Sequence, residues 1–210
     1  MSTEPNDIID HLAGIEPGSR LDGIRARRLR ARENAQRSYL TLFEPADFGD
    51  APAADRGAVA AFEAGLHDEP VVTAFYLAKL AKAGGRPELA AALKAEIEAG
   101  RTKGPYGAFP AGPLSAEDTT GLIYRVTEDR KPVLGKKLAA AIEHAHLLVF
   151  RPRDAAPAAM QALLDAGWST NAIVTLSQLV AFLSFQVRSV AGLRMLGTSL
   201  GQRLVAAKAS

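Results

Sequence analysis

The histidines, with the carboxylates near them, are the residues of this sequence best suited to proton transfer or metal binding. Glu143 and His146 are three positions apart, which places both on one face of a helix, whereas His144 points to a different side. A two-metal site in a helical bundle needs a second Glu-x-x-His pair and two further glutamates, which the sequence does not display. We therefore expect a buried, hydrogen-bonded histidine here, no metal and no other cofactor.

A second candidate group surrounds the start of a predicted helix and consists of His67, Glu69 and Tyr76. Imidazole, carboxyl and phenol groups can donate or accept protons if they converge on one small molecule. The alternative is structural: Asp68 or Glu69 caps a helix, His67 lies at the surface and Tyr76 packs in the core. Both interpretations remain open from the sequence.

A third candidate group lies near the C-terminus, where Ser177, Ala181, Ser184 and Arg188 are spaced to share one helix face. Such small residues allow a close helix neighbour. The other interpretation is a pocket for a small carboxylate or hydroperoxide, with the cation at one end. The lining predicted for that pocket is Ser184, Phe185 and Arg188, together with His144 or His146.

Helices are predicted to position these residues, because apolar residues recur at steps of three and four in every long segment and alternating strand patterns are missing. The fold class predicted is therefore all-α. Residues 100–114 contain several glycines and prolines and are predicted to be irregular, either as a structural loop or as a lid. The predicted helices cover residues 7–13, 19–43, 55–67, 70–83, 87–100 and 134–152, followed by a long helix after Ser169.

Two parts are expected along the chain. Residues 1–50 form an arginine-rich helical arm, and residues 51–210 form a helical domain whose two halves, at about 54–100 and 133–200, are joined by the Gly/Pro-rich loop. The last helix has apolar residues on more than one face, for example Leu176 and Leu179, which predicts a homo-oligomer. Its uncharged stretch, 166–187, includes too many hydroxyl and amide side chains for ~20 residues in lipid, so no membrane span is expected.

The distribution of charge along the chain indicates which partners it is expected to bind. Residues 20–37 contain seven arginines against two acids, which suggests nucleic acid, but the net charge of the chain is only +2. Acidic segments on both sides, at 1–19 and 44–69, are expected to pair with those arginines within the fold or between subunits, so no nucleic-acid partner is predicted. No apolar run that would act as a secretory signal follows Met1, and the expected location is cytoplasmic.

Several sequence patterns together carry a family resemblance. A helix ended by glycine is followed by a short polar turn and a long helix with Phe185-Gln-Val-Arg188 at its centre, close to a Phe-Asn-x-x-x-Arg-like signature. Over residues 54–197 the chain resembles the carboxymuconolactone decarboxylase and alkylhydroperoxidase D-like superfamily, in a cysteine-poor, peroxidase-related branch. The upstream patterns that agree are Arg56, Lys103-Gly-Pro-Tyr-Gly-Ala-Phe-Pro110, His144-Ala-His146 and Arg151-Pro-Arg-Asp154.

The resemblance implies an alkylhydroperoxidase D-like multihelical bundle and a Cys-x-x-Cys pair, with positions near Glu69 and Val72 and a histidine near Tyr76. The chain contains no cysteine, so thiol peroxidase activity is not expected. The function expected is non-thiol small-molecule binding or acid–base chemistry, in oxidant defence or small-molecule catabolism. The alternative is a noncatalytic subunit that assembles with a cysteine-bearing relative.

Overall fold

The computed structural model describes the backbone of residues 5–209 and the side chains of residues 5–200. All regular elements in this part of the chain are helices, which confirms the predicted all-α class. Gly107 and Thr119 form an isolated β-bridge. In chain order the elements are α1 (Ile8–Ala13), α2 (Arg20–Ala26), α3 (Leu29–Phe43), α4 (Ala53–Leu66), α5 (Pro70–Lys82), α6 (Pro87–Gly100), the 3-10 helix η1 (Pro113–Glu117), α7 (Lys131–Phe150), the 3-10 helix η2 (Pro152–Asp154), α8 (Pro157–Asp165) and α9 (Thr170–Ala209).

The chain divides into two compact units. One ends at Glu44 and resumes at Phe185, and the other runs from Pro45 to Ser184. The division thus falls close to the expected boundary at residue 50, but the structure groups the C-terminal part of α9 with the N-terminal helices. Residues 1–4 and 210, at the outer ends of the two expected parts, lie outside the described residues.

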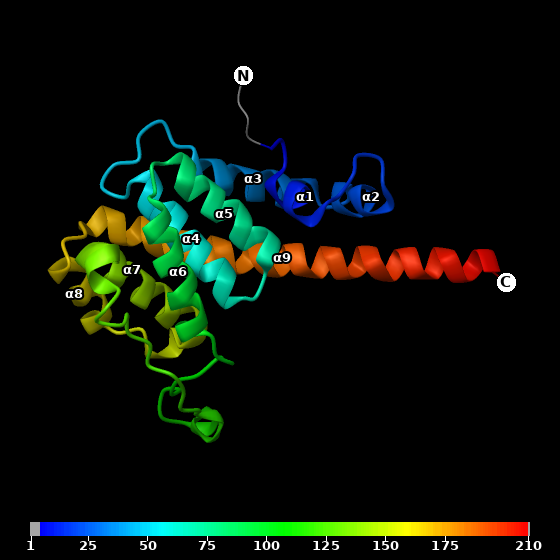
Figure 1. The fold of residues 1–210 in the computed structure, drawn as a ribbon. Helices are drawn as coiled ribbons and strands as arrows, with labels where there is room; N and C mark the ends of the chain where they lie inside the picture. Colours follow the sequence, from blue (N-terminus) through cyan, green and yellow to red (C-terminus); the bar gives the residue numbers. More distant parts are fainter. Residues whose placement is uncertain (1–4, 210) are drawn as a thin grey trace. The chain divides into compact units, whose positions relative to one another are not determined.

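Helix α4 forms the centre of the unit from Pro45 to Ser184. All its residues from Arg56 to Leu66 are buried, and it packs against α5, α6 and α7 (Figure 1). Its alanines and glycines allow this close packing. At Gly65, for example, an added Cβ would lie 2.5 Å from the side chain of Ile97 on α6. Gly65 of α4 therefore allows α6 to approach closely.

The unit that contains the N-terminal helices begins as the sequence predicts. The side chain of Asp7 caps α1, and Gly14 ends it in the left-handed conformation, at φ 68°. The single helix expected over residues 19–43 is instead divided into α2 and α3, because the backbone at Arg28 leaves the helical region, at φ −122° and ψ 48°. No glycine or proline marks this break in the sequence.

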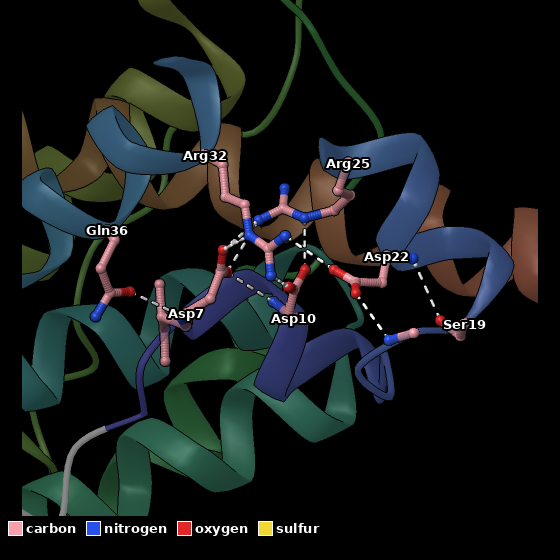
Figure 2. A network of polar contacts seen from close by, with 9 residues as sticks. Asp7, Asp10, Ser19, Asp22, Arg25, Arg32 and Gln36 are labelled. Atoms are coloured by element: carbon pink, nitrogen blue, oxygen red, sulfur yellow. Dashed lines mark hydrogen bonds and ion pairs between the residues drawn. The ribbon is translucent and has the colours of Figure 1, made fainter. Parts of the chain in front are cut away.

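A network of ion pairs accounts for the break between α2 and α3 (Figure 2). Arg25 on α2 and Arg32 on α3 both reach the carboxylate of Asp7, each at 2.8 Å, and both also pair with Asp10 on α1. Arg32 additionally pairs with Asp22, at 2.9 Å. These carboxylates therefore pair with two of the arginines of residues 20–37 within the fold, while the other five arginines there are exposed.

The long C-terminal helix α9 begins after Ser169, as predicted, and the Ser169 hydroxyl accepts a hydrogen bond from the Ala172 amide at 3.2 Å. Leu176 and Leu179, from its two apolar stripes, are both buried, whereas Phe185 is 48% exposed. By length and composition α9 could cross a membrane: over Thr170–Leu200 its best window has a mean hydropathy of 1.4, with half of that window buried. Core helices of soluble proteins meet the same criterion, so the predicted absence of a membrane span stays a prediction.

Candidate functional site

A pocket of about 470 Å³ lies between α7, α8, η2 and the irregular segment that precedes α7. All of its lining belongs to the unit from Pro45 to Ser184. It is lined by Ile123, Tyr124, Arg125, Ala140, Glu143, His144, His146, Leu147, Arg151, Asp154, Ala156, Ala158, Ala159 and Ala162.

The spacing and the size of the lining residues explain why there is space here. Helix α7 presents residues at positions i, i+3, i+4 and i+7, which form one face of a helix. Helix α8 presents only alanines to the pocket, and a side chain of one carbon cannot fill the gap between two helices. The α7 residues of this face are Ala140, Glu143, His144 and Leu147, and the α8 residues are Ala158, Ala159 and Ala162. His146 also lines the pocket from α7.

Both histidines of this lining are buried, and His144 has 4% of its surface exposed. Its Nε2 lies 3.2 Å from the hydroxyl oxygen of Ser177 on α9, and its Nδ1 is buried with no hydrogen-bond partner among the described residues. Burial lowers the pKa of His144 below its ordinary value of 6.5, so the imidazole is neutral near pH 7. A neutral imidazole whose second nitrogen has no partner can accept a proton or a hydrogen bond from a bound molecule.

The neighbouring His146 is held more tightly. Its Nε2 lies 2.9 Å from the carbonyl oxygen of Gly100, and because a carbonyl only accepts, this nitrogen carries the proton. The ring also stacks on Tyr124, with the ring centres 4.7 Å apart. Burial lowers the pKa of His146, against a smaller opposing effect of the Gly100 carbonyl. Gly100 leaves room for this contact, since an added Cβ would be 3.3 Å from the imidazole.

The wall formed by the segment before α7 is fixed from behind by Glu96, which is fully buried on α6. Its carboxylate accepts hydrogen bonds from the hydroxyls of Tyr124 and Thr127 and pairs with Arg130 at 2.9 Å. Burial alone would raise the pKa of Glu96, but these bonds lower it below the ordinary value of 4.5. Burial and the bond to Glu96 raise the pKa of Tyr124, so its phenol stays protonated and donates.

Two arginines and two carboxylates complete the polar lining. Arg125 lies 3.5 Å from Glu143, which also accepts a hydrogen bond from the Val126 amide at 3.0 Å. Arg151 pairs with Asp154 at 2.6 Å, and Asp154 in turn accepts from the Ala108 amide at 3.1 Å. These bonds tie both ends of the irregular segment, residues 101–130, to the helices around the pocket.

The residues proposed from the sequence fall in several places. His144 and His146 line the pocket. His67, Glu69 and Tyr76 are not part of the lining. His67 and Glu69 lie in the turn from α4 to α5, where Glu69 occupies the N-cap position of α5 without a capping bond from its side chain, and Tyr76 lies within α5 and is fully buried. The half-buried His67 lies 4.0 Å from Glu63.

The candidates on α9 are not part of the pocket lining either. Ser184 donates a hydrogen bond to the buried Glu63 at 2.8 Å, while Phe185 and Arg188 are exposed. Ser177, from the same predicted face, is the residue of α9 that contacts His144. The small side chains of this face thus make specific polar contacts with α4 and α7.

Several lining residues were not among the sequence candidates. Tyr124 and Arg125 lie in a segment without helical periodicity, where spacing carries no information about position. The alanines of α8 have no chemistry of their own, although their density in residues 155–166 was a signal for a wall of small side chains. Arg151 and Asp154 entered only through the family resemblance.

No group of three or more His, Cys, Asp or Glu side chains is placed to bind a metal within the described part of the chain. The imidazole, carboxylate, phenol and guanidinium groups of the lining can form hydrogen bonds, and the first three can also exchange protons. Comparison with known proteins gave no matching family, no similar curated protein and no similar solved structure.

Proposed function

We propose that this chain is a thiol-free protein of the carboxymuconolactone decarboxylase and alkylhydroperoxidase D-like class, with the multihelical bundle of that class. In this proposal it binds a small organic molecule in the pocket between α7 and α8 and transfers a proton on it, in small-molecule catabolism or oxidant defence. The observation that carries the proposal is His144, a buried residue of the pocket lining whose Nδ1 has no hydrogen-bond partner among the described residues. The resemblance of residues 54–197 and the helical fold support the class, and the absence of cysteine supports the thiol-free character.

The surroundings of His144 suit a reversible proton acceptor. In the tautomer with the proton on Nε2, that N–H donates to Ser177 Oγ and the lone pair of Nδ1 is available to the ligand. When Nδ1 takes a proton from the ligand, the imidazolium keeps its bond to Ser177, so no other group has to rearrange. The same nitrogen can return the proton to a different atom of the ligand. Its lowered pKa keeps the acceptor form populated near neutral pH.

The absence of cysteine limits this chemistry. Peroxide reduction by a dithiol route needs a thiolate nucleophile and a second, resolving thiol, and the chain has neither. We expect no hydroperoxide consumption above background with a dithiol reductant, with a cysteine-bearing relative as the positive control. Turnover comparable to that of the relative would contradict the proposal.

The proposed binding site is tested with a substitution that fills the pocket. Replacing Ala162 by leucine adds three carbons to the α8 wall, whereas Gln161→Leu places a leucine at the adjacent, exposed position outside the lining. A set of small organic acids, lactones and hydroperoxides is screened by ligand-observed NMR. We expect ligands that bind the unmodified protein and Gln161→Leu equally, and that bind Ala162→Leu at least about tenfold more weakly.

A second variant separates binding from proton transfer. His144→Gln keeps a polar side chain of similar length but cannot act as a base near pH 7. It should retain binding within about threefold and lose at least about a hundredfold in any turnover found. Binding that Ala162→Leu does not weaken would place the ligand elsewhere. Absence of any ligand, together with co-purification of a cysteine-bearing relative, would favour the noncatalytic subunit instead.

A further inference from the structure

We propose that the ligand of this pocket is an amphiphilic monocarboxylate, with its carboxylate bound by Arg125 and its apolar body against Ile123 and the alanines of α8. This inference rests on the proposed function of the pocket and adds the class of ligand. It draws on three features of the lining: one available guanidinium, one exposed apolar residue beside it, and two fixed negative charges.

The guanidinium of Arg125 has N–H donors that can bind a ligand. Its side chain is 69% exposed, and its contacts with the Tyr124 carbonyl, at 3.1 Å, and with Glu143, at 3.5 Å, both use Nη1. Nε and Nη2 take part in neither contact. These two atoms form one side of the guanidinium fork, which matches the two oxygens of a carboxylate. A ligand can therefore bind Arg125 without displacing the bonds it already makes.

The other arginine of the pocket differs in this respect. Arg151 uses the corresponding side of its fork, with Nε at 2.8 Å and Nη2 at 2.6 Å from Oδ2 of Asp154. Asp154 is also bonded to the Ala108 amide. Opening this pair would leave a carboxylate without its partner and release the irregular segment, so Arg125 is the better anion-binding arginine.

The apolar part of the ligand is indicated by the residues next to Arg125. Ile123 is 61% exposed although it lines the pocket, and α8 contributes only alanines. A hydrocarbon chain or ring in this space would remove Ile123 from water, which favours binding. Glu143 and Asp154 are part of the same lining and would repel a second negative group. A ligand with a single carboxylate and an apolar body therefore fits these residues better than a dicarboxylate or a sugar.

Octanoate and octanamide test this inference, because they share the apolar chain and differ in charge. Binding is measured by isothermal titration calorimetry at about pH 8, below the concentration at which octanoate associates. We expect octanoate to bind about tenfold more tightly than octanamide, since hydrogen bonds to a charged group are stronger than neutral ones. Arg125→Gln should weaken octanoate about tenfold and change octanamide less than about twofold. Arg101→Gln, at another partly exposed arginine outside the lining, should change neither.

The outcomes separate the ligand class from the function of the pocket. Equal binding of the two probes, or octanoate binding that Arg125→Gln does not change, would overturn the carboxylate inference and leave the pocket as a neutral-ligand site. Failure of both probes while other small molecules bind and are blocked by Ala162→Leu would overturn the ligand class alone. If no small molecule binds in the pocket, the proposed function fails as well.

Discussion

The ion network of α1–α3 and the pocket between α7 and α8 both contain partly buried charged groups, but they differ in how these groups are paired. In the network, the carboxylates of Asp7, Asp10 and Asp22 are each bound by at least one arginine. In the pocket, a nitrogen of His144 has no partner among the described residues, and one side of the Arg125 fork takes no part in its two contacts.

The difference separates charges that fix the fold from charges that are available to a ligand. A carboxylate bound by two arginines holds helices in place and has little capacity left for a further partner. A polar atom that is buried without a partner costs free energy in the empty protein, and a bound molecule can recover that cost. The arginine run is the densest charge cluster in the sequence, yet its most deeply placed members, Arg25 and Arg32, serve the fold.

The largest expected effect concerns Glu96, the paired charge behind the pocket wall. Glu96→Ala removes the carboxylate that binds Tyr124, Thr127 and Arg130 in a fully buried position, so we expect a loss of about 3–5 kcal/mol in the free energy of unfolding. Urea denaturation measures it. The matched control is Glu98→Ala on the same helix, where the carboxylate is 67% exposed and the loss should stay below about 1 kcal/mol.

Measuring the free energy of unfolding at decreasing pH tests whether the charge of Glu96 is the cause of this loss. Because the pKa of Glu96 is lowered in the folded protein, its pairing stabilises the fold above pH 4.5, and this contribution is lost as the pH falls from there through the folded pKa. Glu96→Gln, which cannot ionise, should lack this part of the acid dependence. If Glu96→Ala costs no more than Glu98→Ala, the wall of the pocket does not depend on this network.

A smaller effect is expected in the N-terminal network. Arg32→Ala removes pairs with three carboxylates, but its side chain is 27% exposed, so water and salt screen part of the interaction. We expect a loss of about 1–2 kcal/mol that shrinks with added salt. Arg30→Ala removes an exposed arginine from the same helix and serves as the control, with a loss below about 0.5 kcal/mol. Equal losses for the two variants would mean that the network contributes no more than ordinary surface charge.

Local sequence signals predicted most of the fold. Asp7 and Gly14 mark the ends of α1, Pro87 and Gly100 mark those of α6, and Ser169 precedes α9, because caps and helix breakers act on the residues next to them. The break between α2 and α3 has no such signal. It follows from ion pairs between residues up to 25 positions apart, a contact that no local pattern encodes.

Only part of the site could be predicted, because here too local signals appear in the sequence and long-range contacts do not. The histidines at 144 and 146 could be proposed from their residue type and helix, but Tyr124 and Arg125 lie in an irregular segment whose position depends on Glu96, 28 residues before Tyr124. The partner of His144, Ser177, was grouped with a small-residue face, and its hydrogen bond 33 residues back along the chain appears only in the folded protein. The family resemblance remains a proposal.

The smallest expected effect concerns His144 and tests the central contrast between paired and unpaired groups. Burial lowers the pKa of His144 in the folded protein, whereas the unfolded chain takes up the proton at the ordinary value of 6.5. The unfolded state therefore binds more protons than the folded state below pH 6.5. As a result, the free energy of unfolding is not reduced by His144 above that pH, and it decreases as the pH drops from 6.5 through the folded pKa. His146 contributes in the same direction.

His144→Gln should remove part of this acid-side loss, so its free energy of unfolding should fall less steeply than that of the unmodified protein between about pH 6.5 and 5. At about pH 8 it should cost about 1 kcal/mol, the value of a neutral hydrogen bond such as the one to Ser177. A slope that His144→Gln does not alter would show that water already reaches and satisfies Nδ1. In that case the pocket would hold no unpaired buried group, and the contrast with the N-terminal network would disappear.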